Sequence, residues 1–155
     1  MVDTYGSCGT LKLIDNNWEV LLKTTYFFYL ALENSSAEDY VTEKLLTALQ
    51  NDVIPIVFGG ANYSRFLPPG SYIDSKKHTI EQLAAIMNGL TQSPEDYREY
   101  FRWKEKYTYH DPTTAENLCR ICQALNDKHL MEHTTYYPNF RKWWNPNYEK
   151  LCSVT

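Results

Sequence analysis

The chain has 155 residues, of which 43% are hydrophobic and 22% are charged, and its net charge at neutral pH is -4. A chain of this length buries about 70% of the surface that its unfolded form exposes, so one folded domain is the first expectation. The acidic balance excludes a broad basic surface for nucleic acid or an anionic membrane, and no apolar run approaches the roughly 20 residues that span a bilayer.

The first predicted elements are a strand end, a short helix and a buried strand. Residues 2–5, followed by a glycine, have the composition of a strand end, and we expect earlier parts of the sheet upstream of this chain. Residues 18–24 show a short helical pattern. The continuous apolar run 26–32 is bounded by polar residues, which predicts a strand buried on both faces, as in a parallel sheet.

A helix and a second strand follow. The helix extends to about Gln50, and residues 53–58 predict another buried strand, which ends at a pair of glycines. Strand, helix and strand in this order form a βαβ unit. Pro55 lies in the middle of the second strand and argues against a central position in the sheet, because proline donates no hydrogen bond to a neighbouring strand.

The next segment predicts a loop, a short strand and two helices. The loop, rich in proline and glycine, covers residues 62–71, the strand 72–73 and the first helix 79–90. The apolar stripe of this helix is Ile80, Leu83, Ala84 and Met87. Ser93 caps the second helix, and Pro94 takes its first position. The order βαβα predicts an α/β fold, a Rossmann-like and mostly parallel sheet flanked by helices.

This predicted α/β domain covers residues 1–106, and the pattern changes after it. Residues 107–155 form an irregular extension that is aromatic and rich in proline and asparagine, with a helical stretch around 118–130. Aromatic side chains suit both packing and the stacking of a sugar ring, and packing is the commoner role. We therefore expect the extension to pack on the domain.

Lys44 stands near the predicted start of the helix between the two buried strands. Free backbone N–H groups already make this end of a helix positive, so a cation there requires a reason. The sequence leaves two caps open: the hydroxyl of Thr42, or a weak capping box formed by Ser36 and Asp39 one turn earlier. With either cap, one side of the helix is polar and carries Tyr40, Glu43 and Lys44.

The polar side of this helix faces the carboxyl end of the first buried strand, the edge at which ligands of parallel α/β sheets bind. A lysine beside free N–H groups is explained if a phosphate occupies the space between them. Glu43 would then accept hydrogen bonds from sugar hydroxyls, and Tyr40 would cover a ring. The alternative is a plain solvated surface, which lysine and glutamate on a helix most often form, and the spacing does not decide between the two.

Two segments around Lys44 resemble the signature of the α1,3/4-fucosyltransferases, glycosyltransferase family ten. In that family a strand ending in Phe-Glu-Asn-Ser leads to Asp-Tyr-x-Thr-Glu-Lys, and this chain has residues 32–35 and 39–44 at those places. Leu32 stands where phenylalanine is usual, an apolar exchange that affects packing and not chemistry. The resemblance continues in order over residues 3–6, 53–57, 59, 62–63, 68, 71–73, 100–104, Cys119-x-x-Cys122 and Trp143-Trp144.

The resemblance implies a GT-B glycosyltransferase with two facing Rossmann-like domains. Such an enzyme transfers L-fucose from GDP-fucose to an N-acetylglucosamine-containing glycan, with inversion at the anomeric carbon, and neither a cofactor nor a divalent metal is implied. Carried onto this chain, Lys44 contacts the diphosphate, Glu43 the ribose hydroxyls and Tyr40 the nucleotide. The other residues of the implied donor site are Glu33, Asn34 and Thr42.

Family members are longer than this chain, and the resemblance places it at their C-terminal, donor-binding part. We expect the membrane anchor, the acceptor-binding domain, the general base and a diphosphate-binding arginine to lie upstream. No residue of this chain is assigned as the base, and Glu33 is the first candidate if one is present. The implied location is the lumenal side of the Golgi cisterna membrane.

The four cysteines allow disulfides, a metal site or plain thiols, and composition does not choose among them. Cys119-x-x-Cys122 has the ligand type of a zinc site but lacks the second compact ligand pair of a zinc module. Other residues of the types that bind zinc are Cys8, Cys152, His129 and His133. In the resembling family the CxxC cysteines form disulfides with the acceptor domain, which suits an oxidising lumen. We expect this role for Cys119 and Cys122, and no metal.

The chain has sequons at Asn34 and Asn62, and we expect a glycan on Asn62, which lies in the predicted loop. The sequence thus predicts the donor-binding half of an inverting fucosyltransferase whose acceptor is an N-glycan core or N-acetyllactosamine type glycan. Two alternatives remain. A non-catalytic nucleotide-sugar-binding chain is favoured if no longer transcript exists, and a structural or zinc-binding module if zinc, and not GDP, stabilises the fold.

Overall fold

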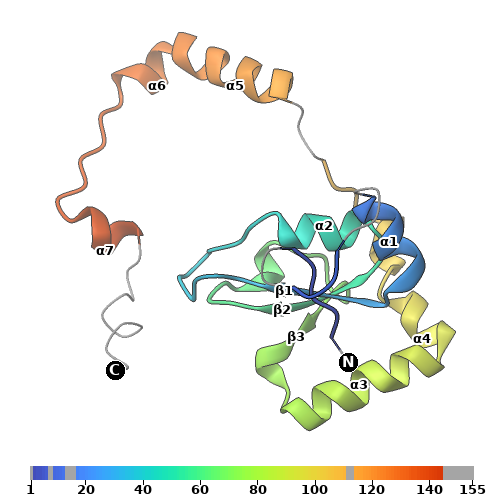
Figure 1. Cartoon of the computed structure of the whole chain (residues 1–155). Helices are drawn as coiled ribbons and strands as arrows, with labels where there is room; N and C mark the ends of the chain where they lie inside the picture. Colours follow the sequence, from blue (N-terminus) through green and yellow to red (C-terminus); the bar gives the residue numbers. More distant parts are fainter. Residues whose placement is uncertain (1, 7–8, 13–16, 111–113, 145–155) are drawn as a thin grey trace. The chain divides into compact units, whose positions relative to one another are not determined.

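A computed structural model of the chain describes residues 2–6, 9–12, 17–110 and 114–144. The chain divides into two compact units, Met1–Tyr107 and Thr108–Thr155. The first contains a sheet with helices packed on it, and the described part of the second contains helices alone (Figure 1).

The sheet of the first unit is parallel, and the strand order within the described residues is β1-β2-β3. These strands are β1 Phe28–Leu32, β2 Ile54–Phe58 and β3 Ile73–Asp74. β1 pairs with β2 along its whole length, from Phe28 opposite Ile54 to Leu32 opposite Phe58. β3 joins the other side of β2 only at Ile56 and Val57. The predicted parallel α/β fold is confirmed, with the strand borders shifted by one or two residues.

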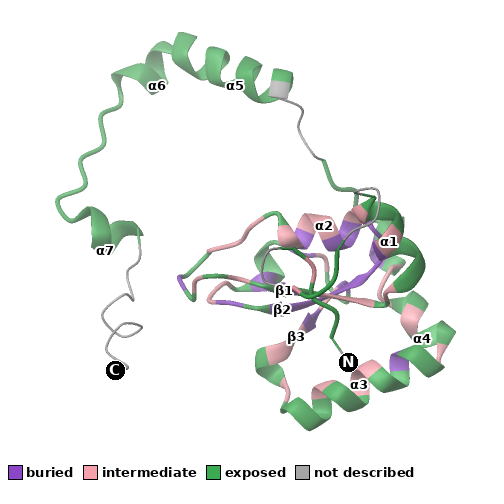
Figure 2. Cartoon of the chain, in the orientation of Figure 1, coloured by how far each residue is buried: buried purple, intermediate pink, exposed green. Residues whose placement is uncertain are grey.

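Helices cover both faces of this sheet (Figure 1). They are α1 Trp18–Thr25, α2 Lys44–Gln50, α3 Ile80–Gln92 and α4 Pro94–Glu99, with short 3-10 helices η1 Tyr63–Arg65, η2 Ser75–Lys77 and η3 Arg102–Glu105. Side chains alternate along β2, so the two faces bury separate cores. Val57 packs with Leu45 and Leu49 of α2, whereas Ile54 and Ile56 pack with residues of α3 and α4. Figure 2 shows the buried residues gathered on the strands and the facing sides of the helices.

The predicted cap of α4 is confirmed, and α3 begins with a capping box that was not predicted. Thr79 and Gln82 form a capping box at the start of α3, and Ser93 accepts a hydrogen bond from the backbone of Asp96 ahead of α4. The predicted stripe of α3 is wrong at Ile80, which is 83% exposed, and at Ala84, which is also exposed. The residues of α3 that pack on the sheet are Leu83, Ile86, Met87 and Leu90. Both stripes fit a helical period, and only the position of the helix over the sheet decides between them.

Two strand predictions need correction. Residues 2–5 form no strand, and their backbone makes only an isolated bridge between Tyr5 and Leu11. β1 is not buried on both faces, because Leu30 is 39% and Leu32 44% exposed. An apolar run indicates a strand that can be buried, but β1 is an edge strand of the described sheet and lacks a neighbour on one side.

Pro55 does lie in the central strand, against the prediction. The backbone N–H of Ile54 donates to Phe27 on the β1 side, so the nitrogen of Pro55 faces the β3 side. Pairing with β3 starts only at Ile56, so the missing N–H removes no ladder bond. Proline is therefore tolerated at this position of a central strand.

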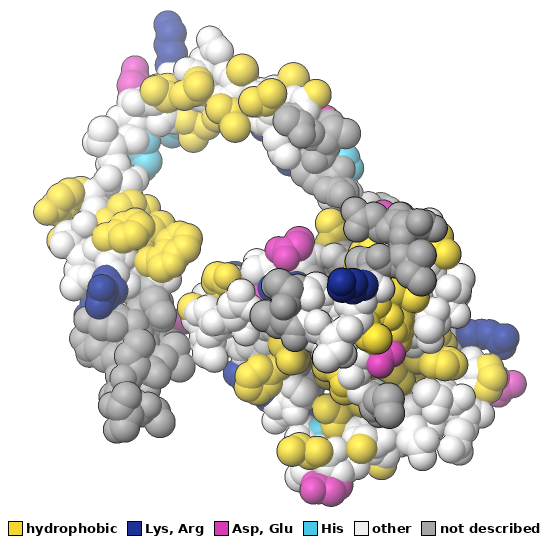
Figure 3. Space-filling model, viewed as in Figure 1, with side chains coloured by type: hydrophobic (Ala, Val, Ile, Leu, Met, Phe, Trp, Pro, Cys, Tyr) yellow, Lys and Arg dark blue, Asp and Glu magenta, His cyan; other side chains and the backbone are white. Residues whose placement is uncertain are grey.

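The second unit contains α5 Thr114–Asn126, α6 Lys128–Glu132 and α7 Phe140–Trp144. This confirms the predicted helical stretch, and Asp127 caps α6. Exposed apolar side chains line α5 and α6 (Figure 3), namely Leu118, Ile121, Leu125, Leu130 and Met131. The packing of this extension on the α/β domain stays a prediction. No helix in the described ranges is long and apolar enough to cross a membrane.

Candidate functional site

The candidate site follows the carboxyl ends of β1 and β2. Glu33 comes directly after β1, and Gly59 comes directly after β2. The N–H of Glu33 donates to the carbonyl of Phe58 at 2.8 Å, so the two segments stay paired beyond the strands. Because the strands are parallel, the polar residues that follow them meet at one edge of the sheet.

The carboxylate of Glu33 is the centre of this edge, and its side chain has no exposed surface. Its Oε1 accepts a hydrogen bond from the backbone N–H of Thr42 at 2.9 Å, and the hydroxyl of Thr42 lies 2.8 Å from Oε2. Lys44 Nζ lies 3.2 Å from the same Oε2 and 2.9 Å from the Thr42 hydroxyl. A buried carboxylate is stable only with such donors and a counter-charge.

Lys44 is the first residue of α2, and its side chain remains 22% exposed. Its ammonium is therefore paired with Glu33, while part of the side chain is exposed to solvent. The predicted cap of α2 by Thr42 is wrong, because the hydroxyl of Thr42 donates to Glu33 instead. Glu43 takes the cap position and makes no side-chain capping hydrogen bond.

The predicted capping box of Ser36 and Asp39 is also wrong. Asp39 adopts a left-handed conformation with φ 59°, and its carboxylate oxygens lie 2.7 and 2.6 Å from Nη1 of Arg65 in η1. This ion pair ties the outer part of the loop between β1 and α2 to η1. Both side chains are about half exposed, so the pair contributes only about 0–1 kcal/mol to stability.

Tyr63 of η1 lies beneath the same edge and is 3% exposed. Within the described part of the chain, its buried hydroxyl has no hydrogen-bond partner. A Cβ added to Gly59 would lie 2.4 Å from this hydroxyl and 3.1 Å from Cβ of Glu33, so the two side chains pack on one glycine. Burial, and then the charge of Glu33, raise the pKa of Tyr63 to about 12, so the hydroxyl keeps its proton. No role was predicted for Tyr63, although it lies in a segment that carries the family resemblance.

The structure thus brings together Glu33, Thr42 and Lys44 of the predicted donor residues. The others, on the same loop, are Asn34 and Glu43, which are exposed, and Tyr40, which is partly buried. Their predicted contacts stay predictions. Glu33 and Thr42 are nine positions apart, and a residue pattern does not predict a hydrogen bond between side chains across such a loop.

The cysteine and glycan predictions concern other parts of the chain. Cys119 and Cys122 on α5 are exposed and form no disulfide within the described ranges, and their disulfide role stays a prediction. Cys8 and Cys152 lie outside the described residues. In the described ranges, no group of three or more His, Cys, Asp or Glu side chains is placed to hold a metal ion. Asn62 is exposed and caps η1 through its side chain, and its glycan stays a prediction.

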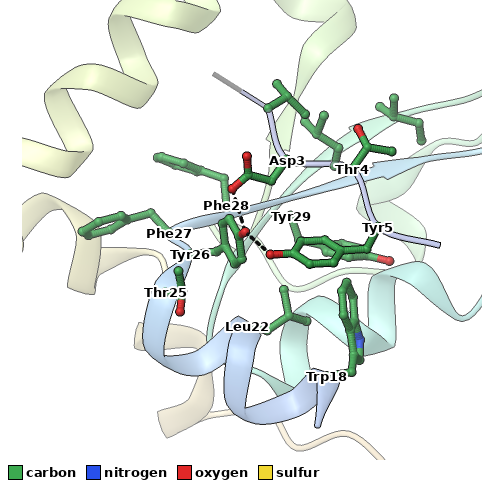
Figure 4. A pocket seen from close by; sticks show the side chains of 13 residues that line it. Asp3, Thr4, Tyr5, Trp18, Leu22, Thr25, Tyr26, Phe27, Phe28 and Tyr29 are labelled. Carbon is green, nitrogen blue, oxygen red and sulfur yellow. Dashed lines mark hydrogen bonds between the residues drawn. The ribbon is translucent and has the colours of Figure 1, made fainter. Parts of the chain in front are cut away.

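A separate open cavity of about 580 Å³ lies along β1 (Figure 4). Tyr26 donates a hydrogen bond to Asp3 at 2.7 Å and lies 2.8 Å from the hydroxyl of Tyr5, and these two hydrogen bonds raise its pKa. Trp18 packs edge-on against Tyr5 and Tyr29. None of the predicted donor residues lines this cavity, so it is distinct from the candidate site.

Known proteins match the chain over most of its length. A family model described as "Glycosyltransferase family 10 (fucosyltransferase) C-term" matches residues 1–143. Alpha-(1,3)-fucosyltransferase C of Drosophila melanogaster is 45% identical over 148 residues, which are 92% of this chain and 34% of that protein. Alpha-(1,3)-fucosyltransferase 4 of Homo sapiens is 37% identical over 129 residues, 80% of this chain and 24% of that protein.

Solved structures give the same fold. A crystal structure of an α1,3-fucosyltransferase with GDP aligns at a TM-score of 0.53 and 21% identity, over 71% of this chain and 33% of that chain. A structure of an α1,3-fucosyltransferase with GDP-fucose aligns at 0.51 and 21% identity, over 74% of this chain and 35% of that chain. The chain spans about a third of the length of the curated relatives it matches.

Proposed function

The chain belongs to glycosyltransferase family 10, the fucosyltransferases, and from this we propose that it binds the GDP-fucose donor of an inverting α1,3-fucosyltransferase. In the proposed reaction, a hydroxyl of N-acetylglucosamine in a glycan displaces GDP from L-fucose in the Golgi lumen. Relatives whose crystal structures contain GDP-fucose and GDP support a nucleotide-sugar donor. The proposal involves no cofactor.

One observation carries this proposal: a lysine ammonium is fixed at the carboxyl edge of a parallel sheet. Lys44 Nζ is held by Glu33 and Thr42, and the side chain is still partly exposed. A diphosphate needs cations, most of all when it leaves as GDP and its charge grows, and a fixed cation stabilises that charge without reorganisation. We assign Lys44 to the diphosphate, Glu43 to the ribose hydroxyls, and Tyr40 and Asn34 to the rest of the donor.

Glu33 is not assigned as the general base. A base must lie within hydrogen-bond reach of the acceptor hydroxyl. The carboxylate of Glu33 is fully buried and already receives hydrogen bonds from Thr42 and Lys44, so it has no free position for an acceptor. We propose that the base, and a further cation for the diphosphate, belong to another part of the enzyme.

Isothermal titration of GDP into the 155-residue chain tests this proposal. Lys44→Ala should weaken binding by about 1.5 to 3 kcal/mol, or roughly 10- to 150-fold, because a charge-assisted phosphate contact is lost. Lys104→Ala is the matched control. Lys104 pairs with Asp52 ahead of β2, at the amino end of the sheet, and its loss should leave GDP affinity unchanged.

Equal GDP affinity of the wild type and Lys44→Ala would refute the assignment of Lys44. Absence of GDP binding by the wild type would refute the donor-binding function. Zinc that raises the melting temperature while GDP does not would favour the structural alternative.

A further inference from the structure

Binding of a diphosphate to Lys44 creates an electrostatic problem beneath it. In the free chain, the ammonium of Lys44 forms an ion pair with the buried carboxylate of Glu33, and no other cation pairs with it among the described residues. If the ammonium turns towards a phosphate, Glu33 keeps only the N–H and hydroxyl of Thr42 as donors. A buried carboxylate that loses a charged donor becomes less stable, and this penalty would oppose ligand binding.

Tyr63 has the opposite problem in the free chain. Its hydroxyl is buried and has no hydrogen-bond partner among the residues that the structure describes, a state that native structures rarely retain without a reason. The hydroxyl packs against Gly59 on the side where Cβ and Cγ of Glu33 also lie, since one added Cβ would meet all three atoms. The Tyr63 hydroxyl, which lacks an acceptor, and Cβ and Cγ of Glu33, whose carboxylate would lack a donor, therefore border the same glycine.

We propose that Glu33 is a positioning residue that exchanges donors when the diphosphate binds. In the free chain Glu33 holds Lys44 in place; in the bound chain Lys44 contacts the phosphate and the Tyr63 hydroxyl donates to Glu33 instead. This inference rests on the proposed function, because the phosphate is that of GDP. The exchange explains why the buried carboxylate of Glu33 and the unpaired hydroxyl of Tyr63 belong to side chains that pack against the same residue, Gly59.

Tyr63→Phe tests the exchange, because it removes only the hydroxyl. The free chain should lose no stability, since the hydroxyl makes no hydrogen bond there. GDP affinity measured by titration should fall about fivefold to tenfold, the effect of one lost hydrogen bond. Tyr72→Phe is the matched control, because its ring lies 6.2 Å from that of Tyr63 and it has no part in the exchange, so its GDP affinity should be unchanged.

A double-mutant cycle separates the exchange from a general packing effect. In the Glu33→Gln background, Tyr63→Phe should change GDP affinity clearly less, because the amide oxygen of glutamine is only a neutral acceptor. The exchange is overturned if Tyr63→Phe lowers GDP affinity equally in both backgrounds, or in neither. The proposed function still stands in that case, provided that GDP binding depends on Lys44. A fall in the stability of free Tyr63→Phe that matches its loss of affinity also overturns it.

A wild-type chain that binds no GDP would reject the proposed function and the exchange together. One readout of the free chain is then still informative: the rate at which acetic anhydride labels Lys44, followed by mass spectrometry with the exposed Lys76 as internal reference. Glu33→Gln should raise the rate at Lys44 and not at Lys76. An unchanged rate would show that Glu33 does not hold Lys44, which overturns the inference at its first step.

Discussion

The packing of Glu33 and Tyr63 on Gly59 makes Gly59→Ala the sharpest test of the site's geometry. The new Cβ would lie 2.4 Å from the Tyr63 hydroxyl, and 3.1 and 3.2 Å from Cβ and Cγ of Glu33. Cβ atoms essentially never lie closer than 3.0 Å to another heavy atom, and Tyr63 is too buried to move away freely. Overpacking of this kind costs about 1–3 kcal/mol, so the free energy of unfolding should fall by that amount. Urea unfolding followed by tryptophan fluorescence measures it.

Two controls isolate the clash from the general effect of replacing glycine. Gly89→Ala makes the same change within α3, where no atom lies within 4 Å of the new Cβ, and should stabilise the chain by about 0.5–1 kcal/mol. In a Tyr63→Phe background the contact at 2.4 Å is absent, so Gly59→Ala should cost clearly less. A neutral Gly59→Ala, or an equal cost in both backgrounds, would refute the described packing.

Three further outcomes are expected. Thr79→Ala removes the capping box of α3 and should lower the free energy of unfolding by about 1 kcal/mol in urea, whereas an unchanged midpoint would contradict the observed cap. Burial, helped by Asp52, raises the pKa of Tyr97 from 10.0 to about 12, and the unfolded chain therefore releases this proton first as pH rises above 10. Stability measured across pH 9 to 12 should thus fall between pH 10 and 12, and less so in Tyr97→Phe; a flat wild-type curve would argue against the shift. Finally, the 155-residue chain should transfer no fucose from radiolabelled GDP-fucose to N-acetyllactosamine, and turnover comparable to that of a longer relative would place a base in this chain after all.

The fold was largely predictable because its signals are local. Two apolar runs with a helix between them predict a parallel βαβ unit, and Thr79, Ser93 and Pro94 mark helix starts by hydrogen bonds within a few residues. The errors arose where a distant neighbour decides the outcome. The exposure of Leu30 depends on whether a further strand lies beside β1, and the tolerance of Pro55 depends on where β3 begins to pair.

The site was predictable in its position but not in its contacts. The carboxyl edge of the sheet follows from the order of the strands, and Lys44 was placed there correctly. The pairing of Glu33 with Thr42 and Lys44 depends on how the loop between β1 and α2 folds back, which a residue pattern does not encode. The same contact explains the wrong cap: a hydroxyl bound to a carboxylate makes a stronger hydrogen bond than one bound to a backbone N–H.

Lys44 at the first position of α2 remains the feature that most needs a reason. The helix dipole disfavours a cation there by about 0.3–1 kcal/mol, and Glu33 offsets this in the free chain. Stability alone does not explain the pair, because an apolar pair of similar size is often as stable as a buried ion pair or more so. A site for an anionic ligand instead requires a cation that is oriented before the ligand binds. The buried carboxylate of Glu33 orients the ammonium of Lys44, and the lysine side chain stays partly exposed, so only part of it must be desolvated on binding. This geometry supports the proposal that Lys44 binds the diphosphate of the donor.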